Sequence, residues 1–244
     1  MDSPTQTSVP LTRIQKLIGA RMASSKRTKP CFYLECKADV TELMGRRHKL
    51  SKALGVKITS NAFLIRALAL AARQFPLVLG RLDQGSEPPV VKIAGEVNVG
   101  IAVNSSQGLV VPVIRQADTK GLAEIALLER LLTQKARSNR LTLEDIEGET
   151  IALSNLGAYD IDSFLGIVPP ATSAILAVGN VGRSIVPSPG RFDARKTMSV
   201  SLAVDHSIVG PEYAATFLTF VAALLGQPER LIQEESQCAV PLKP

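Results

Sequence analysis

The stretch from Val200 to Leu218 reads VSLAVDHSIVGPEYAATFL, and it joins the features that decide the fold. Its apolar residues alternate up to Val204, which is the period of a half-buried β-strand. Pro211 then opens a segment with helical spacing, and proline suits the first turn of a helix. Between them stands His206, whose imidazole is well suited to take a proton from a thiol or hydroxyl near neutral pH. The residues alone also allow a histidine that only satisfies a turn hydrogen bond.

The chain has 244 residues, of which 45% are hydrophobic and 20% charged, as in globular proteins. It has no tryptophan and only 4% aromatic residues, which argues against a surface that stacks nucleic-acid bases. The formal net charge is +6, and basic side chains gather near the N-terminus. They form either a solvated helix face or a surface that steers an anionic partner. We expect no nucleic-acid partner.

The three cysteines, Cys31, Cys36 and Cys238, lack the spacing of metal ligands. With only two histidines in the chain, we expect no metal site. Free thiols suit a reducing compartment, which predicts a cytoplasmic protein, or one of the mitochondrial matrix in a eukaryote. No apolar run reaches membrane-spanning length, so we expect no membrane partner.

Hydrophobic periodicity and cap residues predict one α/β domain with a mixed sheet over residues 10–232. Residues 1–9 are expected to be a linker remnant, and residues 233–244 a polar C-terminal tail. Gly179-Asn-Val-Gly182 lacks the acidic partner and the helix of a phosphate-binding loop. The patterns predict helices over 12–26, 41–54, 60–75, 122–138, 143–146 and 211–225. They predict strands over 32–40, 90–93, 97–103, 109–114, 150–156 and 173–178, a hairpin over 185–197, and a last strand that ends at His206.

Four blocks of the sequence resemble the catalytic domain of the dihydrolipoamide acyltransferases, the E2 components of 2-oxo acid dehydrogenase complexes. The first block is PLTRIQKLIGARMASSK (10–26), followed by Pro30 and Phe32 and ending at DVTEL (39–43). The others are VNVGIAV (97–103) with GLVVPVIR (108–115), TIALSNLG (150–157), and Asp205-His206 with the helix after it. The resemblance covers nearly the whole chain, and the blocks are specific when taken jointly. The resemblance implies the chloramphenicol acetyltransferase-like fold of CoA-dependent acyltransferases, an α/β two-layer mixed-sheet sandwich.

The resemblance also implies an activity: transfer of an acyl group between dihydrolipoamide and coenzyme A in the core of such a complex. His206 would be the general base and Ser154 the donor to the oxyanion, while Asn155, Gly157 and Cys31 would bind substrate. Coenzyme A would be a substrate, and the lipoyl group would arrive on a separate domain. The implied assembly is a homotrimer or a multiple of trimers with active sites between subunits. Further partners would be lipoyl domains, and the E1 and E3 components through domains outside this sequence, which is then an excised core or a shortened natural chain.

The chain departs from the family pattern Asp-His-Arg-x-x-Asp-Gly after His206. Ser207 replaces the arginine, Gly210 the second acid and Pro211 the glycine. Because proline disfavours helical geometry at the preceding residue, restoring an acid is expected to require replacement of Pro211 as well. Cys31 also stands where the family often has histidine. The departures leave open a catalytically weak or inactive E2-like core subunit that serves assembly or partner anchoring. An acyltransferase with a small free acceptor, which the same fold would allow, is a further alternative.

Overall fold

The computed structural model describes residues 8–83, 85–106 and 108–232, and it contains one six-stranded mixed sheet. The strand β8 (Ile151–Asn155) pairs in parallel with β9 (Ala174–Ser188) and with β4 (Val99–Ile101), while the other neighbours are antiparallel. Two smaller antiparallel pairs flank this sheet, β2 (Gly80–Asp83) with β3 (Val90–Ile93), and β5 (Val103–Ser105) with β6 (Gly108–Val110). The order in the main sheet is β1 (Cys31–Asp39), β10 (Arg191–Asp205), β9 (Ala174–Ser188), β8 (Ile151–Asn155), β4 (Val99–Ile101) and β7 (Val113–Ile114). The predicted mixed α/β sheet is confirmed.

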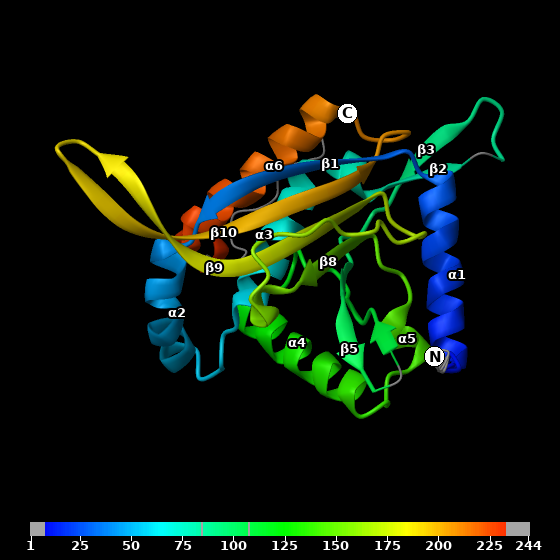
Figure 1. Ribbon diagram of the computed structural model, residues 1–244, viewed down its shortest axis with the longest axis horizontal. Coiled ribbons are helices and arrows are strands. Elements are labelled where there is room, and N and C mark those ends of the chain that lie inside the picture. Colours follow the sequence, from blue (N-terminus) through cyan, green and yellow to red (C-terminus); the bar gives the residue numbers. More distant parts are fainter. Residues whose placement is uncertain (1–7, 84, 107, 233–244) are drawn as a thin grey trace, which may run out of the picture.

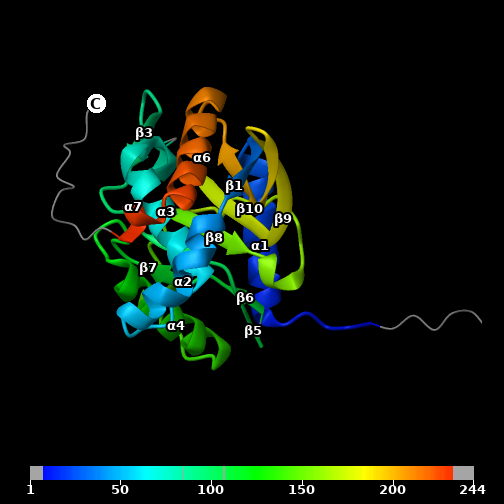
Figure 2. The same cartoon turned by 90° about the vertical axis from the view of Figure 1, so that its left-hand side faces the viewer.

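Helices cover one face of this sheet, as Figure 2 shows for α2 (Thr41–Ala53), α3 (Ser60–Gln74) and α6 (Pro211–Gly226). The main core lies between these helices and the strands, where Val200, Leu202 and Val204 of β10 are fully buried with Phe63 and Phe217. Helix α1 stands apart at the side of the molecule (Figure 1). The helices are α1 (Arg13–Thr28), α2 (Thr41–Ala53), α3 (Ser60–Gln74), α4 (Leu122–Arg137), α5 (Leu143–Ile146), α6 (Pro211–Gly226) and α7 (Pro228–Ile232).

Local signals place these elements correctly. Thr12 caps α1 in a capping box with Gln15, and the Thr59 hydroxyl accepts the Ala62 N–H at the start of α3. The alternation predicted for 32–40 is confirmed, because every second side chain of β1 from Phe32 packs into the main core. The predicted helices match α1 to α6 closely, whereas the expectations for residues 1–7 and 233–244 lie outside the described residues.

The bounds of five predicted strand elements are wrong. The runs 97–103 and 109–114 are each divided into two short strands. Pro112 lies between β6 and β7 in the chain and has no N–H to donate to a neighbouring strand, so the strand does not continue through it. The predicted strand 173–178, hairpin 185–197 and last strand are two continuous strands of 15 residues each, β9 and β10. The Gly179–Gly182 segment lies inside β9. Glycine is required at position 179, because the Asp162 carbonyl oxygen lies where the Cβ atom of any other residue would be.

The far ends of β9 and β10 project beyond the sheet as a ribbon (Figure 1). We refer to residues 185–194 as the arm. In the arm, Ile185 lies opposite Ala194, and Phe192 lies opposite Pro187, so these four side chains share one face. Ile185 and Phe192 are each 76% exposed.

Candidate functional site

His206 lies in the turn directly after β10, with its backbone fixed and its side chain exposed. Its N–H donates to the Pro30 carbonyl at 3.0 Å, which ties the turn to the start of β1. The imidazole meets the Phe32 ring edge-on, with 5.2 Å between ring centroids. The exposed ring nitrogens can therefore reach a substrate while the ring itself is held against β1.

Asp205 and Cys31 lie side by side at the same end of the sheet as His206. Asp205 is buried, and its carboxylate accepts the Ser207 N–H at 3.0 Å, which closes the turn. Burial raises the pKa of the Cys31 thiol, and the Asp205 carboxylate raises it further. The thiol is therefore uncharged near neutral pH, and it packs against a small apolar cluster on the sheet face opposite the main core.

Ser154 and Asn155 end β8, and Gly157 begins the following 3₁₀ turn (Gly157–Tyr159). Ser154 is half-buried on the face opposite the main core, because its neighbour Leu153 faces that core. The Asn155 amide accepts the Gly157 N–H at 2.8 Å and donates to Asn61 at 2.7 Å. A Cβ atom on Gly157 would lie 2.5 Å from the Gly179 carbonyl, so glycine is required where this turn approaches β9.

The structure does not bring Ser154 and His206 together within one chain. Ser154 lies in register with Ala177 of β9, which lies in register with Ser201 of β10. His206 follows Asp205, which lies four residues beyond Ser201 on β10. With about 3.3 Å per residue along a strand and about 4.8 Å between strands, Ser154 and Asp205 are roughly 16 Å apart. The two side chains cannot contact the same reacting group in one copy of the chain.

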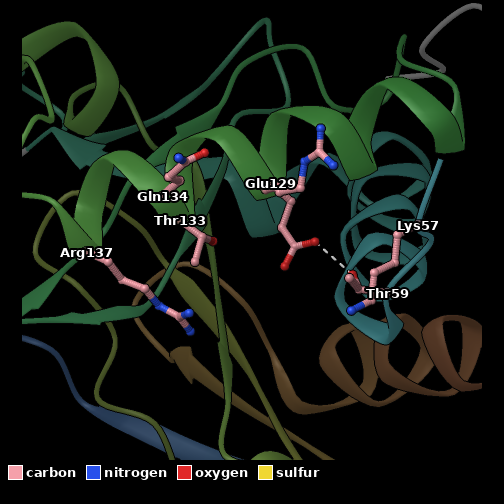
Figure 3. A pocket seen from close by; sticks show the side chains of 7 residues that line it. Lys57, Thr59, Glu129, Thr133, Gln134 and Arg137 are labelled. Carbon is pink, nitrogen blue, oxygen red and sulfur yellow. Dashed lines mark hydrogen bonds between the residues drawn. The ribbon is translucent and has the colours of Figure 1, made fainter.

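A basic pocket of about 380 Å³ lies between α4 and the start of α3 (Figure 3). Its volume is within the range of small-molecule sites. Three cationic side chains and one buried carboxylate belong to its lining, and the Glu129 carboxylate accepts hydrogen bonds from Thr59 at 2.8 Å and Asn61 at 3.3 Å. Asn61 also accepts from Asn155, so hydrogen bonds join the pocket wall to the end of β8. The lining residues are Lys57, Thr59, Glu129, Arg130, Thr133, Gln134 and Arg137.

This pocket was not predicted from the sequence, although α4 carries a signal for it. Arg130, Gln134 and Arg137 recur at helical spacing and so share one face. The contribution of Lys57 was not visible, because it depends on how α3 packs against α4. Among the described residues, no group of three or more His, Cys, Asp or Glu side chains is arranged to hold a metal ion. Within the same ranges, no helix has the length and apolar character needed to span a membrane.

The family described as 2-oxoacid dehydrogenases acyltransferase (catalytic domain) matches residues 3–233 of the chain. The chain belongs to this acyltransferase family.

Several curated members of the acyltransferase family are similar to the chain. It is 34% identical over 231 residues to the dihydrolipoyllysine-residue acetyltransferase component 2 of the mitochondrial pyruvate dehydrogenase complex of Arabidopsis thaliana, covering 92% of this chain and 42% of that protein. It is 32% identical over 220 residues to the corresponding component of Rickettsia bellii, covering 87% and 52%. It is also 33% identical over 232 residues to the mitochondrial pyruvate dehydrogenase protein X component of Mus musculus, covering 93% and 45%. The chain thus spans about half the length of these relatives.

Solved structures of the acyltransferase family share the fold. One was determined to investigate a serine, a histidine and an asparagine in the catalytic mechanism of the dihydrolipoamide acetyltransferase of Azotobacter vinelandii; it is 28% identical, with a TM-score of 0.89 over 93% of this chain and 94% of that chain. The cubic core of a pyruvate dehydrogenase multienzyme complex gives the same values. Chloramphenicol acetyltransferase, at 14% identity and a TM-score of 0.50 over 84% of this chain and 94% of that chain, is similar in fold alone. The expected CoA-dependent acyltransferase fold is confirmed.

Proposed function

We propose that the chain transfers an acyl group between dihydrolipoamide and coenzyme A, with His206 and Ser154 as its catalytic residues. One observation carries the proposal. In the Azotobacter vinelandii enzyme, the serine and histidine studied for their catalytic roles are separated by the same number of residues as Ser154 and His206. This equal spacing in a closely similar fold supports catalytic roles for Ser154 and His206.

His206 acts as the general base. Its exposed imidazole takes the proton from the coenzyme A thiol, and the resulting thiolate attacks the carbonyl carbon of the acyl-dihydrolipoamide thioester. The carbonyl electrons move to oxygen and give a tetrahedral oxyanion. When the oxyanion collapses, the bond to the dihydrolipoamide sulfur breaks, and that sulfur takes the proton back from the imidazolium. The contact with Phe32 and the Pro30 hydrogen bond keep the base in place throughout.

Ser154 donates a hydrogen bond to the oxyanion. Its position at the end of β8 gives the hydroxyl a rigid support, which the hydrogen bonds of Asn155 reinforce. A fixed donor in a site that excludes water stabilises the transition state by a few kcal/mol. We assign Asn155 and Gly157 to the serine side of the site and Cys31 to the histidine side.

The active site is proposed to form between copies of the chain, since within one copy Ser154 lies roughly 16 Å from Asp205, the residue before His206, on ordinary strand spacing. A closed ring of copies, such as the trimer that the family resemblance implies, brings the serine of one copy to the histidine of the next. The similarity to the subunits of a cubic core supports an assembly of several copies.

Mixed assemblies test the reaction and the divided site together. Ser154→Ala and His206→Ala should each lose about a hundredfold or more in thioester exchange between acetyl-CoA and dihydrolipoamide. Co-expression of the two variants in equal amounts should restore about a quarter of the parent activity, since that share of neighbouring pairs keeps both groups. Light scattering must show that parent, variants and mixture have the same mass.

Two results would count against this proposal in different ways. Activity of the mixture no higher than the sum of the separate variants would mean that the site lies within one copy. A correctly assembled parent without thioester exchange would exclude the acyltransferase and favour a core subunit that serves assembly.

The basic pocket is the proposed site for the phosphate groups of coenzyme A. Lys57, Arg130 and Arg137 give it a net positive charge, because Glu129 is the one acid in its lining and is satisfied by two donors. Charge-assisted hydrogen bonds from arginine suit phosphate oxygens. The hydrogen bonds that join Glu129 to Asn61 and Asn61 to Asn155 support a position for the pocket on the serine side of the proposed site.

Truncation of the pocket cations tests this assignment. The double variant Lys57→Ala with Arg137→Ala should raise the KM for coenzyme A about tenfold, because charge-assisted hydrogen bonds are lost. The KM for pantetheine, which has the thiol but no phosphate, should stay unchanged. Lys49→Ala with Lys52→Ala removes the same charge from exposed positions of α2 and is the matched control. An equal rise for both thiols would assign the pocket to structure instead.

A further inference from the structure

The turn that carries His206 depends on two backbone acceptors from different parts of the chain. The Asp205 N–H donates to the Ser173 carbonyl at 2.8 Å, and the His206 N–H donates to the Pro30 carbonyl at 3.0 Å. Pro30 directly precedes β1, and Ser173 directly precedes β9. Any relative movement of these two segments would therefore rotate or shift the histidine.

Lys29 joins the two segments through a single ammonium group. Its Nζ donates to the carbonyls of Pro169 at 2.8 Å, Pro170 at 3.1 Å and Thr172. An ammonium has three donors, so these three carbonyls use its full capacity. Lys29 is the neighbour of Pro30 in the chain, and Thr172 is the neighbour of Ser173, so the contact lies next to both acceptors of the turn.

The surroundings show that this cation is held in place. Lys29 is half-buried, and burial lowers the pKa of its ammonium, while the nearby Asp205 carboxylate opposes that change. Two of the carbonyls belong to consecutive prolines, Pro169 and Pro170, which have no N–H to donate. Charge-assisted hydrogen bonds to a partly desolvated cation are stronger than those between neutral groups.

We infer that Lys29 is a positioning residue for His206: it fixes the segment 169–173 to the start of β1 and so sets the orientation of the catalytic turn. This inference rests on the proposed function of His206. It assigns to Lys29 a role that acts through the backbone of residues 169–173 and of Pro30, because its ammonium donates to the carbonyls of Pro169, Pro170 and Thr172.

Substitution of Lys29 tests the inference by a split between kcat and KM. Lys29→Met should lower kcat for thioester exchange about tenfold, with the KM for acetyl-CoA within about twofold, since a misplaced base weakens the chemical step. Lys29→Arg should recover most of the loss, because a guanidinium also donates to several carbonyls. Lys37→Met makes the same change at an exposed position of β1 and should leave kcat unchanged. If Lys29→Met does not fold, Lys29→Gln replaces it.

The reactivity of His206 provides a second readout that does not need turnover. The chain has two histidines, and His48, exposed on α2, is an internal reference. Modification by diethyl pyrocarbonate, followed by peptide mass spectrometry, should be faster at His206 relative to His48 in Lys29→Met, and return to the parent ratio in Lys29→Arg. An unchanged ratio together with an unchanged kcat would overturn the inference. A parent without thioester exchange would instead refute the proposed function, while the ratio would still test the role of Lys29.

Discussion

Gly210 lies four residues after His206, at the start of α6, and its backbone is extended, with φ −77° and ψ 162°. This is the geometry that a residue before proline prefers, so Pro211 is compatible with any side chain at position 210. The expectation that Pro211 must be replaced together with Gly210 is wrong, because Gly210 precedes the helix and is not part of it. A Cβ atom at this position would meet nothing within 4 Å.

Gly210→Asn is expected to raise kcat for thioester exchange by about threefold or more, through better orientation of the catalytic groups. Counted from the histidine, the asparagine studied in the Azotobacter vinelandii enzyme stands at this position. Asparagine is also a favourable residue at a helix N-cap, so the melting temperature should not fall. Gly210→Ala adds a side chain without a polar group and is the control. Equal rates for both variants and the parent would show that the missing polar group does not limit the proposed thioester exchange.

At the scale of elements, β9 shows how a distant contact overrides a local signal. Gly179 and Gly182 suggest that the strand ends near them, so the sequence predicted a strand over 173–178 that is separate from the hairpin. The strand continues because the segment around Asp162 lies directly over Gly179, and Ile161 accepts the Asn180 N–H at 2.7 Å. Gly179 is therefore required for packing, not for a turn.

Gly179→Ala should destabilise the protein by about 3 kcal/mol or more, because its methyl group would overlap the Asp162 carbonyl. Gly182, on the same strand, has nothing within 4 Å of a Cβ position. Gly182→Ala should leave stability unchanged or raise it by up to about 1 kcal/mol, since glycine weakens a strand. Melting of the two variants by scanning calorimetry gives the comparison. Similar melting of both would mean that the chain near Asp162 moves aside at little cost.

The elements whose boundaries depend on nearby residues were predictable. The hydroxyls of Thr12 and Thr59 start helices at the expected places, and the alternation from Phe32 assigns the correct faces of β1. Strand boundaries that depend on pairing were not predictable. Neither the order of the strands in the sheet nor the packing of Asp162 on Gly179 can be read from a short stretch of sequence.

At the scale of the whole molecule, the candidate site was predictable in part. His206 and Ser154 could be named from their motifs, but their separation in one chain follows only from the registers of β8, β9 and β10. The contact of Lys29 with residues 169–172 joins positions far apart in the sequence. The basic pocket forms only when the start of α3 packs against α4. Tertiary packing creates these features, so the patterns of single segments do not contain them.

The arm gives the molecule an uneven resistance to local opening. The inner halves of β9 and β10 lie within a six-stranded sheet under helices, so their backbone amides open only with the whole domain. The arm is a two-stranded ribbon, and an isolated hairpin is marginally stable in water. Two strands that are each continuous along 15 residues thus pass from the most protected part of the protein to one of its least protected parts. A fluctuation that frays residues 185–194 is stopped where β1 joins the sheet at Thr197, before it reaches the turn that holds His206.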